Sequence, residues 1–259
     1  MTRKIQRYGW KRDNPDHRDL KFAAVHRVEA LSVPPAYSLK PTIKFVFDQG
    51  DLGSCTANST MLMWEMTHGP APDGGHWSRM FTYIESLIYE RSYPQDAGAE
   101  LRDVMKVLAT KGTPPDSEFP YVVKNFPHKP SHGVIVDARK DKIVTYSRLT
   151  ERADFLNCLA SGHPFVFGFT VYESFESDEV AKTGVVPMPG KNEKEMGGHA
   201  VCCVGYDQNF QGTGELYYLV QNSWGEDWGD PKNPGCFWIP AAYLENPDLA
   251  SDYWTCRNS

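Results

Sequence analysis

The order of its local sequence patterns most constrains the fold of this chain. Apolar residues recur at helical spacing in the first half, over about residues 54–66, 78–91 and 99–110. From about residue 140 strand-like runs replace them, interrupted by one short helix at about 152–160: PFVFGFTV, HAVCCVGY, LYYLVQNSW and CFWIP. Helices segregated from strands predict an α+β fold with two lobes, and ligand sites tend to form in the cleft between lobes.

Composition excludes several classes of protein. A formal net charge of -6 and a pI near 5.8 give no general attraction for nucleic acid or anionic lipid. The first residues, MTRKIQRYGW, lack the apolar core of a secretory signal, and the sequence has no apolar run long enough to cross a membrane. We therefore expect no nucleic-acid or membrane partner, and a cytoplasmic location unless a signal has been removed.

The six cysteines do not form a disulfide framework or a zinc site. They stand at positions 55, 158, 202, 203, 236 and 256, without dense, even spacing and without CxxC pairs. The adjacent cysteines at 202 and 203 would point to opposite faces of a strand. The sequence predicts no structural metal.

Cys55 stands at the start of a predicted helix, with Ser54 as the expected N-cap. A thiol performs acyl transfer only as the thiolate, which the positive end of a helix dipole stabilises. Gly53 would let a substrate backbone approach closely. A lone cysteine here is more often a small buried residue of a helix cap, so its assignment depends on its neighbours.

Three segments supply those neighbours. DQGDLGSC spans residues 48–55, GGHAVCCVGY spans 197–206, and QNSWG spans 221–225 with a second Trp-Gly close behind. From Cys55 to His199 is 144 residues, within the range of about 130–150 for a papain-type base. In this order the segments resemble the active-site segments of papain-like cysteine peptidases, the papain and cathepsin family.

The resemblance implies a role for each matching residue. Cys55 would be the nucleophile and His199 the acid and base, while Asn222 would orient the imidazole and Trp224 would shield their hydrogen bond. Gln49 and the backbone N–H of Cys55 would bind the oxyanion. Peptide bonds would be hydrolysed through a thioester acyl-enzyme, with a peptide or protein as the substrate and with no metal or organic cofactor.

The same resemblance suggests substrate-binding residues. Ala97 and Gly98 occupy the place of the strand that pairs with the substrate backbone. Ser251 aligns near the floor of the pocket for the second residue before the cleaved bond, with Asp252 beside it. A small neutral floor would favour an apolar or aromatic side chain, whereas an inward Asp252 would favour a basic one.

The family likeness also suggests a domain division. Residues 1–34 would be an N-terminal extension or short pro-segment, and 35–259 the papain-like peptidase domain. Within that domain, about 51–138 would form the helical left lobe, and about 35–50 with 139–259 the β-barrel-like right lobe. The segment RYGWKRDNPDHRDLKF looks similar to the short leader of bacterial members, and could either inhibit the cleft or form a permanent strap. The apolar surface of Tyr8, Trp10 and Leu20 predicts burial and not a disordered tail.

Alternative functions remain open at this stage. Carboxydipeptidase members of the family carry adjacent histidines, which this chain lacks, so an endopeptidase is favoured. A catalytically silent binding protein would share the fold, and an acyl transferase would use the same triad. Leu52 stands where many relatives have a disulfide cysteine, which weakens any argument for an oxidising compartment.

Overall fold

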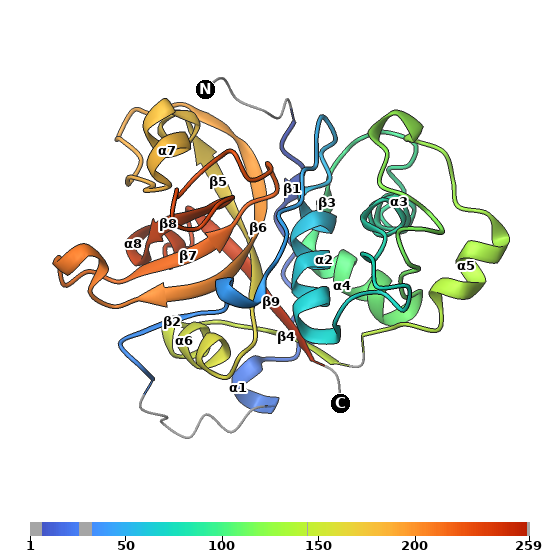
Figure 1. Cartoon of the computed structure of the whole chain (residues 1–259), viewed down its shortest axis with the longest axis horizontal. Helices are drawn as coiled ribbons and strands as arrows, with labels where there is room; N and C mark the ends of the chain where they lie inside the picture. Colours follow the sequence, from blue (N-terminus) through green and yellow to red (C-terminus); the bar gives the residue numbers. More distant parts are fainter. Residues whose placement is uncertain (1–6, 26–32, 144, 258–259) are drawn as a thin grey trace.

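The computed structural model describes residues 7–25, 33–143 and 145–257. Figure 1 shows two halves side by side, one built of helices and the other of an antiparallel sheet with short helices around it. This is the predicted α+β arrangement.

The helical half contains α2 (Cys55–His68), α3 (Arg79–Tyr89), α4 (Leu101–Thr110) and α5 (His132–Ala138). The predicted helices near 54, 78 and 99 are thus confirmed, whereas α5 was not predicted. The Ser78 side chain accepts a hydrogen bond from the Phe81 N–H and caps α3. The helix expected at residue 99 begins at Leu101, because the two residues before it, Ala99–Glu100, form strand β3.

The other half is a seven-stranded sheet in the order β4-β9-β5-β6-β7-β8, with β2 also paired to β6. Every pairing in it is antiparallel. The longest strands are β5 (Phe165–Tyr172), β6 (Glu195–Asp207) and β9 (Ala250–Arg257). The others are β2 (Ala36–Ser38), β4 (Thr145–Arg148), β7 (Tyr217–Gln221) and β8 (Cys236–Pro240). The four strands expected from apolar runs are all present.

Short helices accompany the sheet. The predicted helix near 152–160 is α6 (Arg152–Ala160). Two further helices, α7 (Asp178–Thr183) and α8 (Ala241–Leu244), escaped prediction because they are too short to show helical periodicity.

The N-terminal segment runs along the seam between the halves, from β1 (Trp10–Lys11) to α1 (Phe22–Val25) (Figure 1). β1 pairs in parallel with β3, so it belongs to a separate two-stranded sheet. Phe22 is 1% exposed and joins the main core, but Leu20 is 45% exposed. The predicted burial of Leu20 is wrong because its backbone carbonyl, which accepts the Arg148 N–H at 2.7 Å, makes the contact in place of its side chain.

In the described ranges, no helix has the length and apolar character that crossing a membrane requires. The same ranges hold no group of three or more His, Cys, Asp or Glu side chains suited to a metal ion.

Candidate active site

Cys55 is the first residue of α2, where that helix meets the sheet. Its side chain is fully buried, and the Ala200 N–H of β6 donates to Sγ at 3.4 Å. Ser54 precedes the helix, but its hydroxyl bonds Tyr121 Oη at 2.5 Å and does not cap the helix as expected. The first N–H groups of α2 therefore remain directed at the region around the sulfur.

His199 lies on β6, directly before Ala200, and its ring is fully buried. Asn222 Oδ1 lies 2.8 Å from His199 Nε2 and also accepts the Ser223 N–H at 2.8 Å. Because the Ser223 N–H identifies this atom as the amide oxygen, Nε2 must donate the shared hydrogen bond. This fixes the tautomer and leaves Nδ1 as the nitrogen that can exchange a proton with substrate or thiol.

Trp224 packs beside this pair. Its ring centroid lies 5.3 Å from that of His199, and the indole is 1% exposed. An apolar ring in this position excludes water from the His199–Asn222 hydrogen bond, which strengthens it.

The Gln49 side chain is held at both ends. Its Oε1 accepts the Ser223 hydroxyl at 2.7 Å, and its Nε2 donates to the Leu52 carbonyl at 2.9 Å. A primary amide nitrogen carries two hydrogens, so one N–H of Gln49 is left for a ligand. Ser223, which anchors both Gln49 and Asn222, was not singled out from the sequence, although it lies inside the QNSWG motif.

Residues 8–11 of the N-terminal segment lie over the thiol, and we call them the blocking segment. The Gly9 N–H points at Cys55 Sγ, while the Gly9 carbonyl accepts the Ala99 N–H at 2.8 Å. A Cβ added to Gly9 would lie 1.7 Å from the Gly53 carbonyl oxygen, so only glycine fits this crossing of two backbones. The thiol therefore faces the Gly9 N–H, while the Gly9 carbonyl is bonded to Ala99.

Of the residues predicted to bind the substrate backbone, Gly98 is buried and Ala97 is exposed. Gly98 has φ +71, and a Cβ there would lie 2.2 Å from the Gly9 carbonyl oxygen. The blocking segment thus runs where the sequence predicted a substrate strand.

Tyr8 and Trp10 flank Gly9 on either side of the thiol. The Tyr8 hydroxyl donates to Glu176 at 2.5 Å, and its ring centroid lies 5.5 Å from that of His199. The Trp10 indole lies against the backbone at Gly168, where a Cβ would come within 1.9 Å of it.

The Trp10 indole contacts Gly168, Gly198 and Asp252, and we call this surrounding the Trp10 pocket. Asp252 forms its polar end. Its Oδ2 accepts the Trp10 indole N–H at 3.2 Å, and its φ of +62 is uncommon for a residue other than glycine. Ser251, the residue predicted near the floor, is half-buried, and its hydroxyl has no hydrogen-bond partner among the described residues. The Asp252 side chain is 3% exposed and is therefore turned inward.

A buried cluster of charges holds the part of the chain that follows, residues 13–22, which we call the anchor segment. Arg148 donates to Asp13 at 2.6 Å, to Asp19 at 2.9 Å and to Asp252 at 3.2 Å. Arg102 makes two hydrogen bonds to Asp19, at 2.9 and 2.7 Å. Three carboxylates thus surround two guanidinium groups, and the anchor segment supplies two of the three.

Asp13 also completes a helix end. Its Oδ1 accepts the Arg102 N–H at 3.1 Å in the first turn of α4, where Glu100, the N-cap residue, makes no side-chain cap. The Trp254 indole donates to Oδ2 of Asp13 at 2.8 Å. Burial, followed by the neighbouring Asp252 carboxylate, raises the pKa of Asp13 to about 6.

Burial also raises the pKa of the Cys55 thiol, to about 11, although the N–H groups of Ala200 and Gly9 oppose the shift. The thiol is therefore protonated near neutral pH in this covered form. A covered, protonated thiol is a poor nucleophile.

Comparisons with known proteins agree with this architecture. Residues 36–233 match the sequence pattern of the papain family cysteine proteases. A peptidase C1-like protein of Acanthamoeba polyphaga mimivirus is 32% identical, over 95% of this chain and 85% of that protein. The crystal structure of xylellain, a cysteine protease from Xylella fastidiosa, superimposes with a TM-score of 0.82 at 34% identity, covering 97% of this chain and 96% of that one.

More distant structures share the fold. ProCathepsin B S9 from Trypanosoma congolense has a TM-score of 0.70 at 19% identity and covers 97% of this chain and 87% of its own. The fold and the comparisons define a papain-like cysteine peptidase, a hydrolase. The chain belongs to the papain family of cysteine proteases.

Proposed function

We propose that the chain is a cysteine endopeptidase in which Cys55, His199, Asn222 and Gln49 carry catalysis and residues 8–11 keep it latent. The observation that carries the catalytic part is the hydrogen bond of 2.8 Å from His199 to Asn222, beside a thiol at a helix N-terminus. Such a pair supports acyl transfer because the hydrogen bond at Nε2 assigns proton exchange to the other ring nitrogen, Nδ1.

The chemistry follows from the four groups. The Cys55 thiolate attacks the peptide carbonyl, and the Cys55 N–H and the free N–H of Gln49 hold the resulting oxyanion. His199 protonates the leaving amine, which gives the thioester. His199 then takes a proton from water, the hydroxide attacks the thioester, and Cys55 is released.

The proposal that the chain is latent depends on how the blocking segment is oriented over the thiol. Its Gly9 N–H is directed at the thiol, and its Gly9 carbonyl accepts a hydrogen bond from the Ala99 N–H. A segment bound in this way obstructs the cleft without being a substrate. Residues 1–34 then act at least in part as an inhibitory pro-segment.

The Trp10 pocket supports a substrate preference. A pocket that accepts an indole and ends at the Asp252 carboxylate suits a long side chain with a hydrogen-bond donor at its tip, such as Arg or Lys. Arg148 already contacts Asp252 at 3.2 Å, which offsets part of its charge. We therefore expect basic and aromatic side chains at this position to be cleaved faster than small apolar ones.

The test is hydrolysis of fluorogenic peptides under reducing conditions by a chain that begins at Arg12. Cys55→Ala should abolish cleavage, and Gln49→Ala should lower kcat about a hundredfold or more. Cys158→Ala, which changes another fully buried cysteine, serves as the matched control and should retain activity.

Two outcomes would redirect the proposal. If the shortened chain neither cleaves any peptide nor reacts with a thiol-directed peptide epoxide, a catalytically silent binding protein becomes the better reading. If added amines appear in the products in preference to water, the triad serves an acyl transferase.

A further inference from the structure

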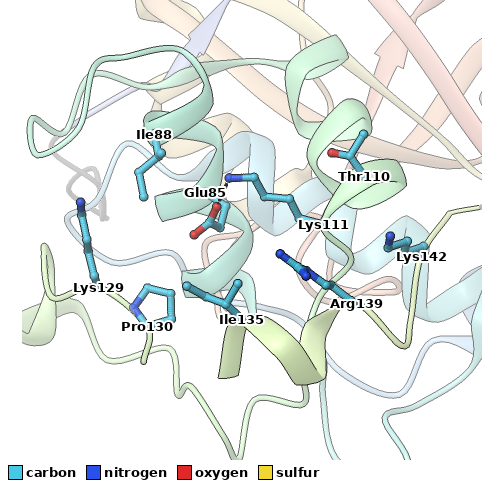
Figure 2. A pocket seen from close by; sticks show the side chains of 9 residues that line it. All are labelled: Glu85, Ile88, Thr110, Lys111, Lys129, Pro130, Ile135, Arg139 and Lys142. Carbon is cyan, nitrogen blue, oxygen red and sulfur yellow. Dashed lines mark hydrogen bonds and ion pairs between the residues drawn. The ribbon is translucent and has the colours of Figure 1, made fainter. Parts of the chain in front are cut away.

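A cavity on the helical half, outside the active site, gathers unpaired positive charge. It has a volume of about 510 Å³ and lies between α3, the end of α4 and α5 (Figure 2). This volume is within the range of small-molecule sites. The described residues that line it include four cations and one carboxylate, in a chain whose formal net charge is -6.

One of the four cations is already neutralised. Lys111, the C-cap residue of α4, forms an ion pair with Glu85 of α3, whose side chain is 5% exposed. Lys129 lies 4.6 Å from the centroid of the Tyr93 ring, a contact that leaves its charge in place. Within residues 7–25, 33–143 and 145–257, neither Arg139 nor Lys142 makes a side-chain hydrogen bond or ion pair.

Helix dipoles account for only part of this cluster. Lys111 and Arg139 end α4 and α5, where cations are favoured in any protein. Lys129 and Lys142 lie outside the helices and have no such explanation. Lys140 lies on the same turn as Arg139 and forms an ion pair with Asp137. A cation on this turn can therefore be paired when a carboxylate lies close to it.

The cavity is built on backbone that cannot easily rearrange. Gly112, with φ +76, brings the end of α4 so close to α5 that a Cβ would lie 1.9 Å from the Ala138 carbonyl oxygen. The Thr113 N–H donates to the Asp141 carbonyl at 3.1 Å, and the Ile143 N–H to the Leu108 carbonyl at 3.3 Å. These bonds hold the loop that carries Arg139 and Lys142 in place.

The rest of the lining is apolar. Ile88 of α3 and Pro130 and Ile135 around the start of α5 line the space between the cations. Figure 2 shows the guanidinium of Arg139 directed toward the Glu85–Lys111 pair, with Lys129 and Lys142 on opposite sides. Cations at the rim of the cavity, with apolar side chains between them, favour a ligand that has a negatively charged head and an apolar tail.

We propose that this cavity binds a small organic anion whose head group carries two or more negative charges and whose tail is apolar. The head group contacts Arg139 and Lys142, and the tail covers Ile135, Pro130 and Ile88 in the direction of Lys129. Phosphate esters and dicarboxylates share this chemistry. The site is separate from Cys55, so its occupation does not require an open cleft.

The test is calorimetric titration of the full chain with inorganic phosphate, hexyl phosphate and hexylsuccinate at low and high salt. Hexyl phosphate should bind about tenfold more tightly than inorganic phosphate, because part of its tail is buried. Binding to hexyl phosphate alone would identify a phosphate ligand, and binding to hexylsuccinate alone a dicarboxylate. Binding to neither tailed anion overturns the proposal.

The variant Arg139→Gln with Lys142→Gln should weaken binding about tenfold or more and reduce its salt dependence. Both side chains are exposed, so the variant should fold, which its melting temperature checks. Lys140→Gln is the matched control, since it removes the same charge from the same turn but outside the cavity. Equal binding by the double variant and the control would also overturn the proposal.

Discussion

The blocking segment and the anchor segment are consecutive in sequence but are held in different ways. Residues 8–11 lie on the active site through backbone contacts at Gly9, one phenol and one indole. Residues 13–22 place two carboxylates among buried guanidinium groups and Phe22 in the core. On the proposed function, removing the first part would uncover Cys55, whereas removing the second would leave buried charges without partners.

The comparison implies that removing the residues before Arg12 is sufficient for activation, and that removing all residues before Pro35 is not required. Arg102 is 5% and Arg148 19% exposed at the side chain, and of the three carboxylates around them only Asp252 lies outside the anchor segment. We therefore interpret the anchor segment as a permanent part of the folded peptidase.

The largest expected effect separates two truncations. A chain beginning at Arg12 should hydrolyse peptides about a hundredfold faster than the full chain, if about 1% of the full chain is open at any time. A chain beginning at Pro35 should lose about 3–5 kcal/mol of stability or fail to fold, because Arg102 and Arg148 lose partners. Initial rates and urea unfolding measure the two effects. Equal stability of both truncated chains would contradict the division.

A single substitution in the anchor segment should reproduce the loss of stability. Asp19→Ala should destabilise the chain by about 3 kcal/mol, because Arg102 loses two hydrogen bonds and stays buried. Asp16→Ala removes a carboxylate that pairs with exposed Arg18, and its melting temperature should stay unchanged. Chemical denaturation of both variants checks the difference, and similar results for the two would argue against a special role for the anchor.

One methyl group should loosen the blocking segment. In Gly9→Ala the new Cβ would clash with the Gly53 carbonyl, so the docked state should lose about 2 kcal/mol, and the peptidase activity of the full chain should rise roughly thirtyfold. Gly133→Ala, whose Cβ would meet only the Ser131 hydroxyl at 3.8 Å, should leave activity unchanged. The relative initial rates of the two variants are the readout. An inactive Gly9→Ala chain with a normal melting temperature would show that the segment does not obstruct the active site.

The smallest effect concerns pH. The pKa of Asp13, in the anchor segment, is raised to about 6 in the folded chain, so the protonated form is favoured there. Its contribution to stability is therefore full below the unfolded pKa, near 4, and is lost as pH rises through about 6. The folding equilibrium constant of the Arg12 chain should fall up to about tenfold from about pH 5 to about pH 7, which urea unfolding at each pH measures.

Asp13→Asn removes the titrating group beside Asp252 and Arg148 and should flatten the pH dependence of stability. An equal fall in the stability of the Asp13→Asn chain between the two pH values would mean that another group controls it.

The sequence was sufficient for those parts of the molecule whose signals are local. Helices α2, α3, α4 and α6 are indicated by apolar spacing over nine or more residues, and strands β5, β6, β7 and β8 by continuous apolar runs. The motifs around Cys55, His199 and Asn222 mark residues near the start or end of such elements, so they could be located once the elements were known. The Ser54 hydroxyl forms a hydrogen bond with Tyr121, which lies in a loop 67 residues away. Local N-cap preferences take no account of such a distant partner, so they predicted a helix cap instead.

What the sequence by itself determined is therefore the order of the four longer helices and four apolar strands, the family and the candidate catalytic residues, since each depends on spacing within a segment or between recognisable segments. Only the tertiary structure showed which carboxylates pair with the two buried guanidinium groups. It also showed that the Trp10 indole N–H donates to Asp252, and that unpaired cations surround a partly apolar cavity. Partners in the first two groups come from segments separated by 80 or more residues, and the cavity lining comes from three helices and the loops beside them. The charge of a side chain does not identify its partner, so such pairings become visible only when packing brings the segments together.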